Sequence, residues 1–313
     1  MTGMSAHPSR RAFEHIARYY RGDRDFTASA QLFVEAALDN AEPVLAAAPT
    51  PRLDLLRSTL GNATPRVSMV DLADAGRNPA CIIPVMREFC DRHPGRRTRL
   101  LTESTWGDRS PAERRACITH EALVNLAFVG HTATVLCLCD VNRLDAAIGD
   151  AFRSAHPFQL AHGRLQVNDR YRPDLLGAIA NQPLPPRPPT AIERAVDAAT
   201  VDHARWFATA YGRNAGLDAT QLIDLEIAVT ELATMTALTG DGTGLLRMWT
   251  DADHMVCEVS NRRHPSDPLE GRRPFQEADP LSRALLVVNQ VVDLAHTHTV
   301  PDRTTTRIHL RLA

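Results

Sequence analysis

Cysteine and histidine are the most reactive side chains in this sequence, and two of their patterns suggest metal ligation. Cys117 lies three residues before His120, and Cys137 lies two residues before Cys139. Thiolate and imidazole groups bind zinc and haem iron. However, neither spacing matches a known zinc pattern, and Cys137 and Cys139 would share one face of an inner strand. We therefore expect reduced, buried cysteines and no metal site.

Lysine is absent, so all 35 Lys+Arg positions are arginine. This excludes lysine nucleophiles, Schiff bases and the lysine of a phosphate-binding loop. A net charge of −2 gives no overall attraction to nucleic acid or to an anionic membrane. The sequence contains neither the ~18-residue apolar run of a membrane helix nor a signal-peptide core. We expect a cytoplasmic protein without direct nucleic-acid or membrane partners.

A proline-rich segment divides the chain. Five of the seven residues from 183 to 189 are proline, a composition that favours an extended spacer and excludes a helix or an inner strand. A length of 313 residues also exceeds that of a typical single domain. We predict an N-terminal domain over 1–182, a linker over 183–190 and a C-terminal domain over 191–313.

In the N-terminal domain, short β-rich runs alternate with helical stretches. Predicted strands cover 43–46, 67–70, 100–103 and 133–139, and predicted helices cover 53–60, 82–89, 112–128 and 144–152. Four successive strand-then-helix units predict an α/β domain with a mostly parallel sheet and helices on both faces. Ligands of such sheets bind beyond the carboxyl ends of the strands.

The C-terminal domain has a different order of elements. Predicted helices at 191–211 and 219–238 precede a hairpin at 245–249 and 255–259, an amphipathic helix at 281–294 and a last strand at 305–312. Helices segregated from a largely antiparallel sheet predict an α+β fold.

The motifs of this domain resemble a known family. Residues 225–234 (LEIAVTELAT), 245–249 (LLRMW) and 256–259 (VCEV) are similar to the GHKL (Bergerat-type) ATPase sandwich, and most closely to the anti-sigma serine kinases of bacterial partner-switching systems. The resemblance covers about residues 191–313. It implies ATP and Mg²⁺ as cofactors, and a sigma factor or an anti-anti-sigma protein as the partner.

The sequence departs from this family at the position that binds the metal. The resemblance implies that Glu231 is the activating carboxylate and that an asparagine four residues later holds Mg²⁺. These two positions share one helical face, but the second is Met235. A thioether is a poor ligand for a hard cation that prefers oxygen.

Two further family elements are also changed. The Asp-x-Gly that reads the adenine falls on Asn261-Arg262-Arg263, and the glycine-rich lid over the phosphates falls on Ser282-Arg283-Ala284-Leu285, which has no glycine. We therefore expect a pseudokinase without ATP turnover, although Arg263 and Arg283 leave metal-free phosphate binding open. The residues of this degenerate site are Glu231, Met235, Asn261, Arg263, Ser282, Arg283 and Leu285.

The N-terminal domain resembles the MEDS sensory domain of methanogen, methylotroph and DcmR-type regulators. The similar stretches are 13–15, 20–23, 78–80, Cys117 with 120–126, and 153–157. The resemblance implies a small-molecule ligand and a sheet like that of RecA/KaiC ATPases without their phosphate machinery. In agreement, residues 46–51 after the first predicted strand contain neither glycine nor lysine, so no phosphate loop forms there.

Polar and aromatic residues of the resembling stretches and near the predicted strand ends are candidates for a sensory pocket. They are His15, Tyr20, Arg21, Asp23, Glu103, Trp106, His120 and Glu121. Structural roles stay open for each: His120 as a buried histidine bonded to the backbone, Arg21 with Asp23 as a turn clamp, and Trp106 as local packing.

Together these features favour a signalling regulator. The N-terminal domain would sense a small ligand or a partner, and the C-terminal domain would bind a sigma factor or an anti-anti-sigma protein without ATP. One alternative is an active serine-protein kinase or ATPase that uses Glu231. A second is a homodimeric scaffold that has no ligand.

Overall fold

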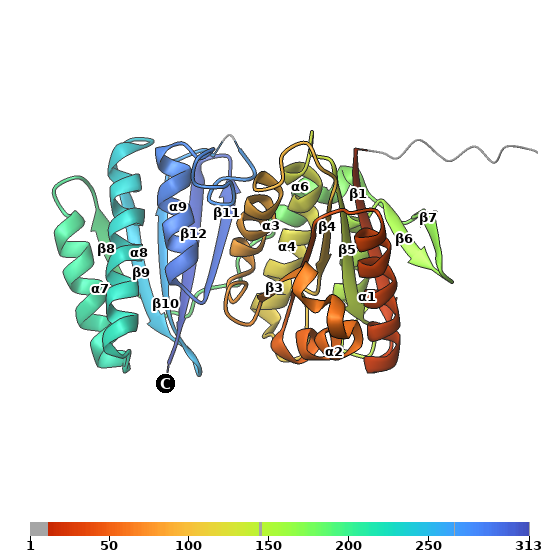
Figure 1. Cartoon of the computed structure of the whole chain (residues 1–313). Coiled ribbons are helices and arrows are strands. Elements are labelled where there is room, and N and C mark those ends of the chain that lie inside the picture. The colour runs from red at the N-terminus through yellow and green to blue at the C-terminus, as the bar shows by residue number, and fades with distance from the viewer. Residues whose placement is uncertain (1–11, 144–145, 266, 313) are drawn as a thin grey trace, which may run out of the picture.

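The computed structural model describes residues 12–143, 146–265 and 267–312, which form two adjacent units (Figure 1). The first eleven residues of the predicted N-terminal domain and the first two of the predicted helix 144–152 lie outside the described residues. No helix in the described ranges is long and apolar enough to cross a membrane.

The N-terminal unit is built on a seven-stranded sheet of order β3-β2-β4-β5-β1-β6-β7. All of its neighbouring strands are parallel except the β6–β7 hairpin. The strands are β1 (Phe13–Tyr20), β2 (Val44–Ala48), β3 (Val67–Asp71), β4 (Thr98–Thr102), β5 (Ala133–Asp140), β6 (Phe158–Ala161) and β7 (Arg164–Val167). The predicted mostly parallel α/β sheet is confirmed.

Helices cover both faces of this sheet, as predicted. One face packs against α1 and α2, and the other against α3, α4 and α5. The helices are α1 (Gly22–Asp39), α2 (Thr50–Leu60), α3 (Ile82–Asp91), α4 (Pro111–Ala127), α5 (Ala146–Ala155) and the short α6 (Leu176–Ala180). Alternate residues of β5 reach opposite cores, with Leu136 and Leu138 on one side and Cys137 and Cys139 on the other.

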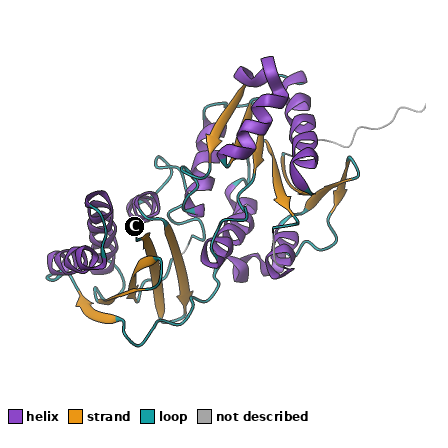
Figure 2. Cartoon of the chain, turned by 90° about the horizontal axis from the view of Figure 1, so that it is seen from below, coloured by secondary structure: helices purple, strands orange, loops and turns teal. Residues whose placement is uncertain are grey.

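The C-terminal unit is an antiparallel five-stranded sheet of order β11-β12-β10-β9-β8, with three helices packed on one face (Figure 2). This confirms the α+β expectation. Its elements are β8 (Ile192–Val196), α7 (Val201–Ala215), α8 (Ala219–Leu238), β9 (Gly244–Thr250), β10 (His254–Asn261), α9 (Pro280–Val291), β11 (Leu294–Val300) and β12 (Arg303–Arg311). A reciprocal capping box between Asp218 and Gln221 starts α8.

Residues 191–211 are not one helix, so that prediction is wrong. Ile192–Val196 forms the edge strand β8, which pairs with β9, and α7 begins only at Val201. Between them, the Asp197 and Thr200 side chains bond nearby backbone N–H groups, which is the turn geometry that these residues favour over helix.

The strands β1, β6, β7 and β11 and the helix α1 were missed, and one predicted helix was too long. β1 has polar and charged residues in the middle of the sheet, and the His-Thr alternation of β11 carries little apolar signal. The predicted helix 281–294 ends at Val291, and Leu294 already belongs to β11. β1 pairs with β5 and β6 on its two sides, and the edge strand β11 pairs with β12. In both strands this pairing outweighs weak local preference.

Direct contacts join the two units. Asn78 donates from Nδ2 to the Asn289 carbonyl at 2.9 Å, and Arg87 pairs with Glu277 at 2.5 Å. Leu269 is buried in the same core cluster as α3 and α4. Residues 267–279, which we call the docked segment, thus connect β10 and α9 while packing against the N-terminal unit.

Candidate functional site

Polar side chains meet where the central strands of the N-terminal sheet end. The Tyr20 hydroxyl donates to Glu103 Oε1 at 2.7 Å, and the Arg52 guanidinium lies 3.4 Å from Glu103 Oε2. Arg52 also pairs with Asp23 at 2.5 Å and lies 3.6 Å from Asp140. This strand-end group brings Tyr20, Asp23 and Glu103 together, whereas Arg52 and Asp140 were not predicted.

Burial controls the charge of the strand-end group. Desolvation raises the pKa of Glu103 to about 7, although Tyr20 and Arg52 partly oppose the shift. The pKa of Tyr20 rises well above its usual range through burial and the nearby carboxylate. The group therefore holds a proton that titrates near neutrality.

His15 of β1 and Glu121 of α4 lie farther inside the domain than the strand-end group, and both are fully buried. His15 Nε2 lies 3.3 Å from Glu121 Oε2. The sequence placed them with the strand-end residues, but His15 points from the first half of β1 toward α4. They form a second centre within the same unit.

The other three candidates belong to neither centre. Trp106 is stacked under the Arg109 guanidinium, whose carbon lies 3.7 Å from the ring centroid. Arg21 is exposed and bonds Asn142. His120 is fully buried with neither ring nitrogen hydrogen-bonded, and burial lowers its pKa to about 4.

We call the set of predicted C-terminal residues the nucleotide-site region. In it, Met235 is buried in the core that α7, α8 and α9 form on the sheet. Glu231, one turn earlier, is partly exposed. Asn261 donates from Nδ2 to the Thr236 hydroxyl at 2.9 Å, and its Oδ1 accepts from the Arg263 N–H at 3.1 Å.

Arg263 and the predicted lid are likewise engaged within the chain. Arg263 is buried and places Nη1 2.5 Å from both carboxylate oxygens of Glu270. Residues 282–285 form the first turn of α9, where Asp279 caps the Ser282 N–H and Leu285 enters the core. Arg283 lies over the Phe275 ring.

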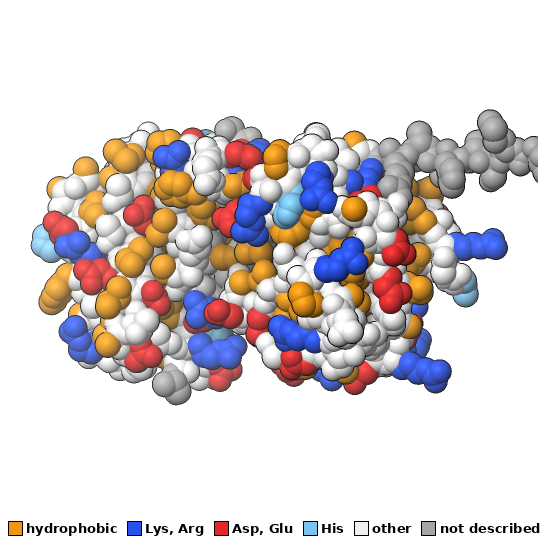
Figure 3. Space-filling view, in the orientation of Figure 1, with side chains coloured by type: hydrophobic (Ala, Val, Ile, Leu, Met, Phe, Trp, Pro, Cys, Tyr) orange, Lys and Arg blue, Asp and Glu red, His pale blue; other side chains and the backbone are white. Residues whose placement is uncertain are grey.

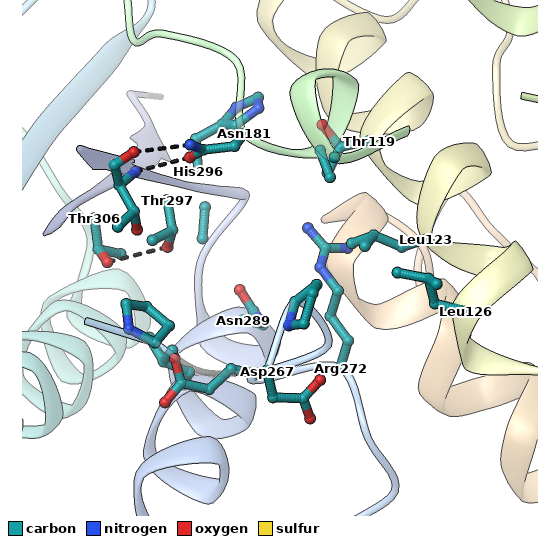
Figure 4. A pocket seen from close by; sticks show the side chains of 18 of the residues that line it. Thr119, Leu123, Leu126, Asn181, Asp267, Arg272, Asn289, His296, Thr297 and Thr306 are labelled. Carbon is teal, nitrogen blue, oxygen red and sulfur yellow. Dashed lines mark hydrogen bonds between the residues drawn. The ribbon is translucent and has the colours of Figure 1, made fainter. Parts of the chain in front are cut away.

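A cavity of about 300 Å³ lies between the two units (Figure 4). From the N-terminal side it is lined by α4 and by the segment around α6, and from the C-terminal side by the docked segment, α9 and β11. Thr119, Leu123, Asn181, Asn289 and Thr306 are among its lining residues. A molecule bound there would contact both units.

Arg272 supplies the positive charge among the lining residues of this cavity, which also include the carboxylates of Asp267 and Glu270, paired with Arg273 and Arg263. Its side chain reaches from the docked segment toward Thr119 and Leu123 of α4 (Figure 4), and its Nη1 is buried with no hydrogen-bond partner. Burial lowers the pKa of Arg272 to about 10. His296 lines the same cavity, and burial together with Arg272 lowers its pKa to about 3.

Comparison with protein families assigns the two units. Residues 14–157 match the model of the MEDS domain, the methanogen/methylotroph, DcmR sensory domain. Residues 195–310 match that of the histidine kinase-like ATPase domain. The chain combines these two domains. Histidine kinase-like ATPase domains typically bind ATP and Mg²⁺.

Among solved structures, a similar one contains the RsbU and RsbW domains of Rv1364c from Mycobacterium tuberculosis. It shares 14% sequence identity with a TM-score of 0.30, and the match covers 40% of this chain and 33% of that one. No curated protein matches the chain.

The MEDS domain therefore contacts the ATPase-like domain through the docked segment between β10 and α9. Sequence patterns missed Arg52, Arg272 and the docked segment. Arg272 lies within GRRPF, where nothing local separates it from the many other arginines.

Proposed function

We propose that this chain is a signalling regulator whose ATPase-like domain binds a protein partner without using ATP, under the control of the MEDS domain. The observation that carries the proposal is the docked segment. Leu269 and Glu277 hold it against the MEDS domain, so residues between β10 and α9 are committed to an interdomain contact. A change in the MEDS domain would therefore reach the ATPase-like domain directly.

The contacts of the nucleotide-site region support the absence of ATP chemistry. Met235 offers a buried thioether where magnesium requires oxygen. The Arg263–Glu270 ion pair fills the position after β10, and residues 282–285 are helical, so they do not form a backbone wrap around phosphates. These residues do not fit a nucleotide with bound magnesium.

The outer helices support a protein-binding role. Three large apolar side chains of these helices are exposed. Trp206 of α7 is 70% exposed, and Ile223 and Leu238 of α8 are 58% and 74% exposed. Figure 3 shows hydrophobic side chains among the charged ones over these helices. Exposed aromatic and aliphatic anchors are typical of interface centres. The resemblance to anti-sigma kinases makes a sigma factor or an anti-anti-sigma protein the proposed partner.

The interdomain cavity is the proposed site of the sensed small molecule. The unpartnered Nη1 of Arg272 favours an anion, because a carboxylate or phosphate would accept a hydrogen bond from this buried group. The apolar side chains of Leu123, Leu126 and Leu176 also line the cavity, and its carboxylates Asp267 and Glu270 already have arginine partners. A small organic acid or phosphate ester would then shift the equilibrium between domain arrangements by binding one of them more tightly.

Two titrations test the nucleotide and partner claims. Calorimetry of the full chain with ATP and Mg²⁺ should give no binding, and the chain should form a 1:1 complex with a purified sigma factor or anti-anti-sigma protein of its host in nucleotide-free buffer. Micromolar ATP binding that Glu231→Ala abolishes together with phosphate release would instead establish the kinase. A stable dimer that binds neither partner nor metabolite would establish the scaffold.

The ligand claim has its own test. Thermal shift across a panel of small carboxylates and phosphate esters should find stabilising compounds whose effect disappears in Arg272→Gln. Arg283→Gln is the matched control, because Arg283 belongs to the same domain but lies over exposed Phe275. Equal stabilisation of Arg272→Gln and the unmodified chain would rule out this cavity.

A further inference from the structure

Four potential metal ligands meet inside the MEDS domain. His15 of β1, Glu121 of α4, Cys137 of β5 and His156, which follows α5, place one ligand atom each within 4.8 Å of the others. All four side chains are at most 1% exposed. We call them the interior cluster. Sequence analysis predicted no metal site, but it did not consider these four residues together.

The tautomer of His156 is determined by a backbone carbonyl. Its Nδ1 lies 2.7 Å from the Phe152 carbonyl oxygen, which can only accept a hydrogen bond. Nδ1 therefore carries the proton, and neutral His156 presents a bare lone pair at Nε2. That nitrogen is buried, has no hydrogen-bond partner and lies 3.3 Å from Glu121 Oε2.

The tautomer of His15 follows from Asn125. The Asn125 amide donates from Nδ2 to the Ala155 carbonyl at 2.7 Å, so its Oδ1 must face His15 Nδ1 at 3.2 Å. An amide oxygen can only accept a hydrogen bond, so Nδ1 of neutral His15 carries the proton. This leaves a lone pair on His15 Nε2. This nitrogen lies 3.3 Å from both Glu121 Oε2 and Cys137 Sγ.

Both imidazoles thus direct lone pairs at one carboxylate oxygen. With both imidazoles neutral and Glu121 ionised, the single proton among the facing atoms is that of the Cys137 thiol, which reaches one acceptor at a time. Burying several acceptors that share one donor is costly, and a cation at the centre would satisfy all of them.

The geometry points to a divalent transition-metal ion as that cation, and we propose that His15, Glu121, Cys137 and His156 bind one such ion, with Zn²⁺ as the probe. Two imidazoles, one carboxylate and one thiolate form a tetrahedral zinc set. With Zn–N and Zn–O bonds of about 2.1 Å, the N and O ligand atoms of a tetrahedron lie about 3.4 Å apart, and a Zn–S bond of about 2.3 Å places sulfur about 3.6 Å from a nitrogen. The two His–Glu121 contacts, at 3.3 Å, are close to the first separation, and the 3.3 Å between His15 Nε2 and Cys137 Sγ is slightly shorter than the second.

Outer contacts already orient the ligands as a metal site requires. Ser104 donates to Glu121 Oε1 at 2.5 Å, so Oε2 remains directed at the cluster. The Thr102 hydroxyl donates to Cys137 Sγ at 3.3 Å, and Asn125 and the Phe152 carbonyl hold the two imidazoles. Such partners stabilise ligand orientation at metal sites. Binding would replace the thiol proton by the metal and release that proton to solvent.

The experiment measures metal content and affinity in the full-length chain. Because the ligands are buried, the chain is unfolded in urea with a chelator and refolded with or without Zn²⁺. We expect one zinc per chain by elemental analysis. In competition with a chromophoric chelator, Glu121→Gln and His156→Gln should weaken zinc binding more than about 100-fold, beyond the loss expected for an outer-shell partner.

Matched variants separate ligation from folding. His120→Gln changes the fully buried histidine beside Glu121 and should leave zinc affinity unchanged. Cobalt replaces zinc in a second readout, in which Cys137→Ser should abolish the sulfur-to-cobalt charge-transfer band while Cys139→Ser retains it. Circular dichroism shows whether His156→Gln folds. If it does not, the comparison of Cys137→Ser with Cys139→Ser still reports on metal ligation.

Three results would overturn the inference. One is refolded chain that contains no zinc. Another is zinc affinity that is unchanged in both Glu121→Gln and His156→Gln. The third is zinc that is lost in His309→Gln, which would place the ion at the partly exposed Asp251, His254 and His309 group.

Discussion

In the MEDS domain, the interior cluster directs acceptor atoms at one another, whereas in the ATPase-like domain the nucleotide-site region places donors against acceptors. His156 Nε2 has no partner. Asn261 bonds Thr236 and Arg263 Nη1 bonds Glu270, although Nε and Nη2 of Arg263 are buried without a partner. Buried polar atoms are satisfied unless a ligand completes them. The two regions therefore differ in charge: the first gathers potential metal ligands around a carboxylate, whereas the second pairs a carboxylate with an arginine.

The largest expected effect comes from loading the interior cluster. Zinc at about 1,000 times its dissociation constant should stabilise the chain by about 4 kcal/mol, measured as a shift of the urea midpoint between zinc-loaded and chelator-treated protein. Cys139→Ser should show the same shift. An identical shift in Glu121→Gln would mean that the stabilising ion binds elsewhere.

Breaking the ion pair of the nucleotide-site region should have the next largest effect. Glu270→Ala leaves the Arg263 guanidinium buried without its counter-charge, so it should lower the free energy of unfolding by about 3 kcal/mol. The double variant Arg263→Met/Glu270→Met should recover most of this loss, because it buries no charge. If Glu270→Ala unfolds at the unmodified urea concentration, the pair is not structural and the contrast between the two regions fails.

The strand-end group should contribute a pH dependence of about 3 kcal/mol. The pKa of Glu103 is about 7 when folded, against an ordinary value of 4.5. Between these values the folded chain binds more protons than the unfolded chain, so stability is full below about pH 4.5 and falls as the pH rises through 7. Urea unfolding at several pH values should show this decline, and Glu103→Gln should flatten it. An unchanged slope in that variant would assign the decline to another group.

The smallest expected effect on stability is at the surface. Trp206→Ser alters an exposed side chain, so the free energy of unfolding should change by less than about 0.5 kcal/mol. Binding to the partner protein should nevertheless weaken, measured by calorimetry with purified components. His203→Ser, on the same helix, is the control. Wild-type affinity in Trp206→Ser would exclude α7 from the interface.

The repeating elements of the fold could be predicted because their signals are local. β2 is apolar throughout, β5 is apolar from Val135 to Cys139, and Ser110 and Glu113 form the capping box that begins α4. Prediction failed where pairing partners decide the outcome. β1 is a polar strand between two neighbours, and β11 is a polar edge strand paired with β12. The run from Ile192 to Val196 is a strand because β9 lies beside it.

The candidate residues divide in the same way. A single missing ligand such as Met235 is visible in a motif, because helical spacing alone places it beside Glu231. The partners of Tyr20 and Glu103 were only partly found, since Arg52 comes from a helix with no motif of its own. His15 and Glu121 were named as candidates, but their partners Cys137 and His156 were not.

The sequence by itself determined the two-domain order, the mostly parallel and antiparallel sheets, and the departure from the family motif at Met235. Only the tertiary structure decided that His15, Glu121, Cys137 and His156 converge, and that residues 267–279 pack on the MEDS domain. The physical reason is range: helix, strand and turn preferences act over a few residues. In contrast, His15 lies 122 positions from Cys137, and such distant residues meet only when strands pair and helices pack.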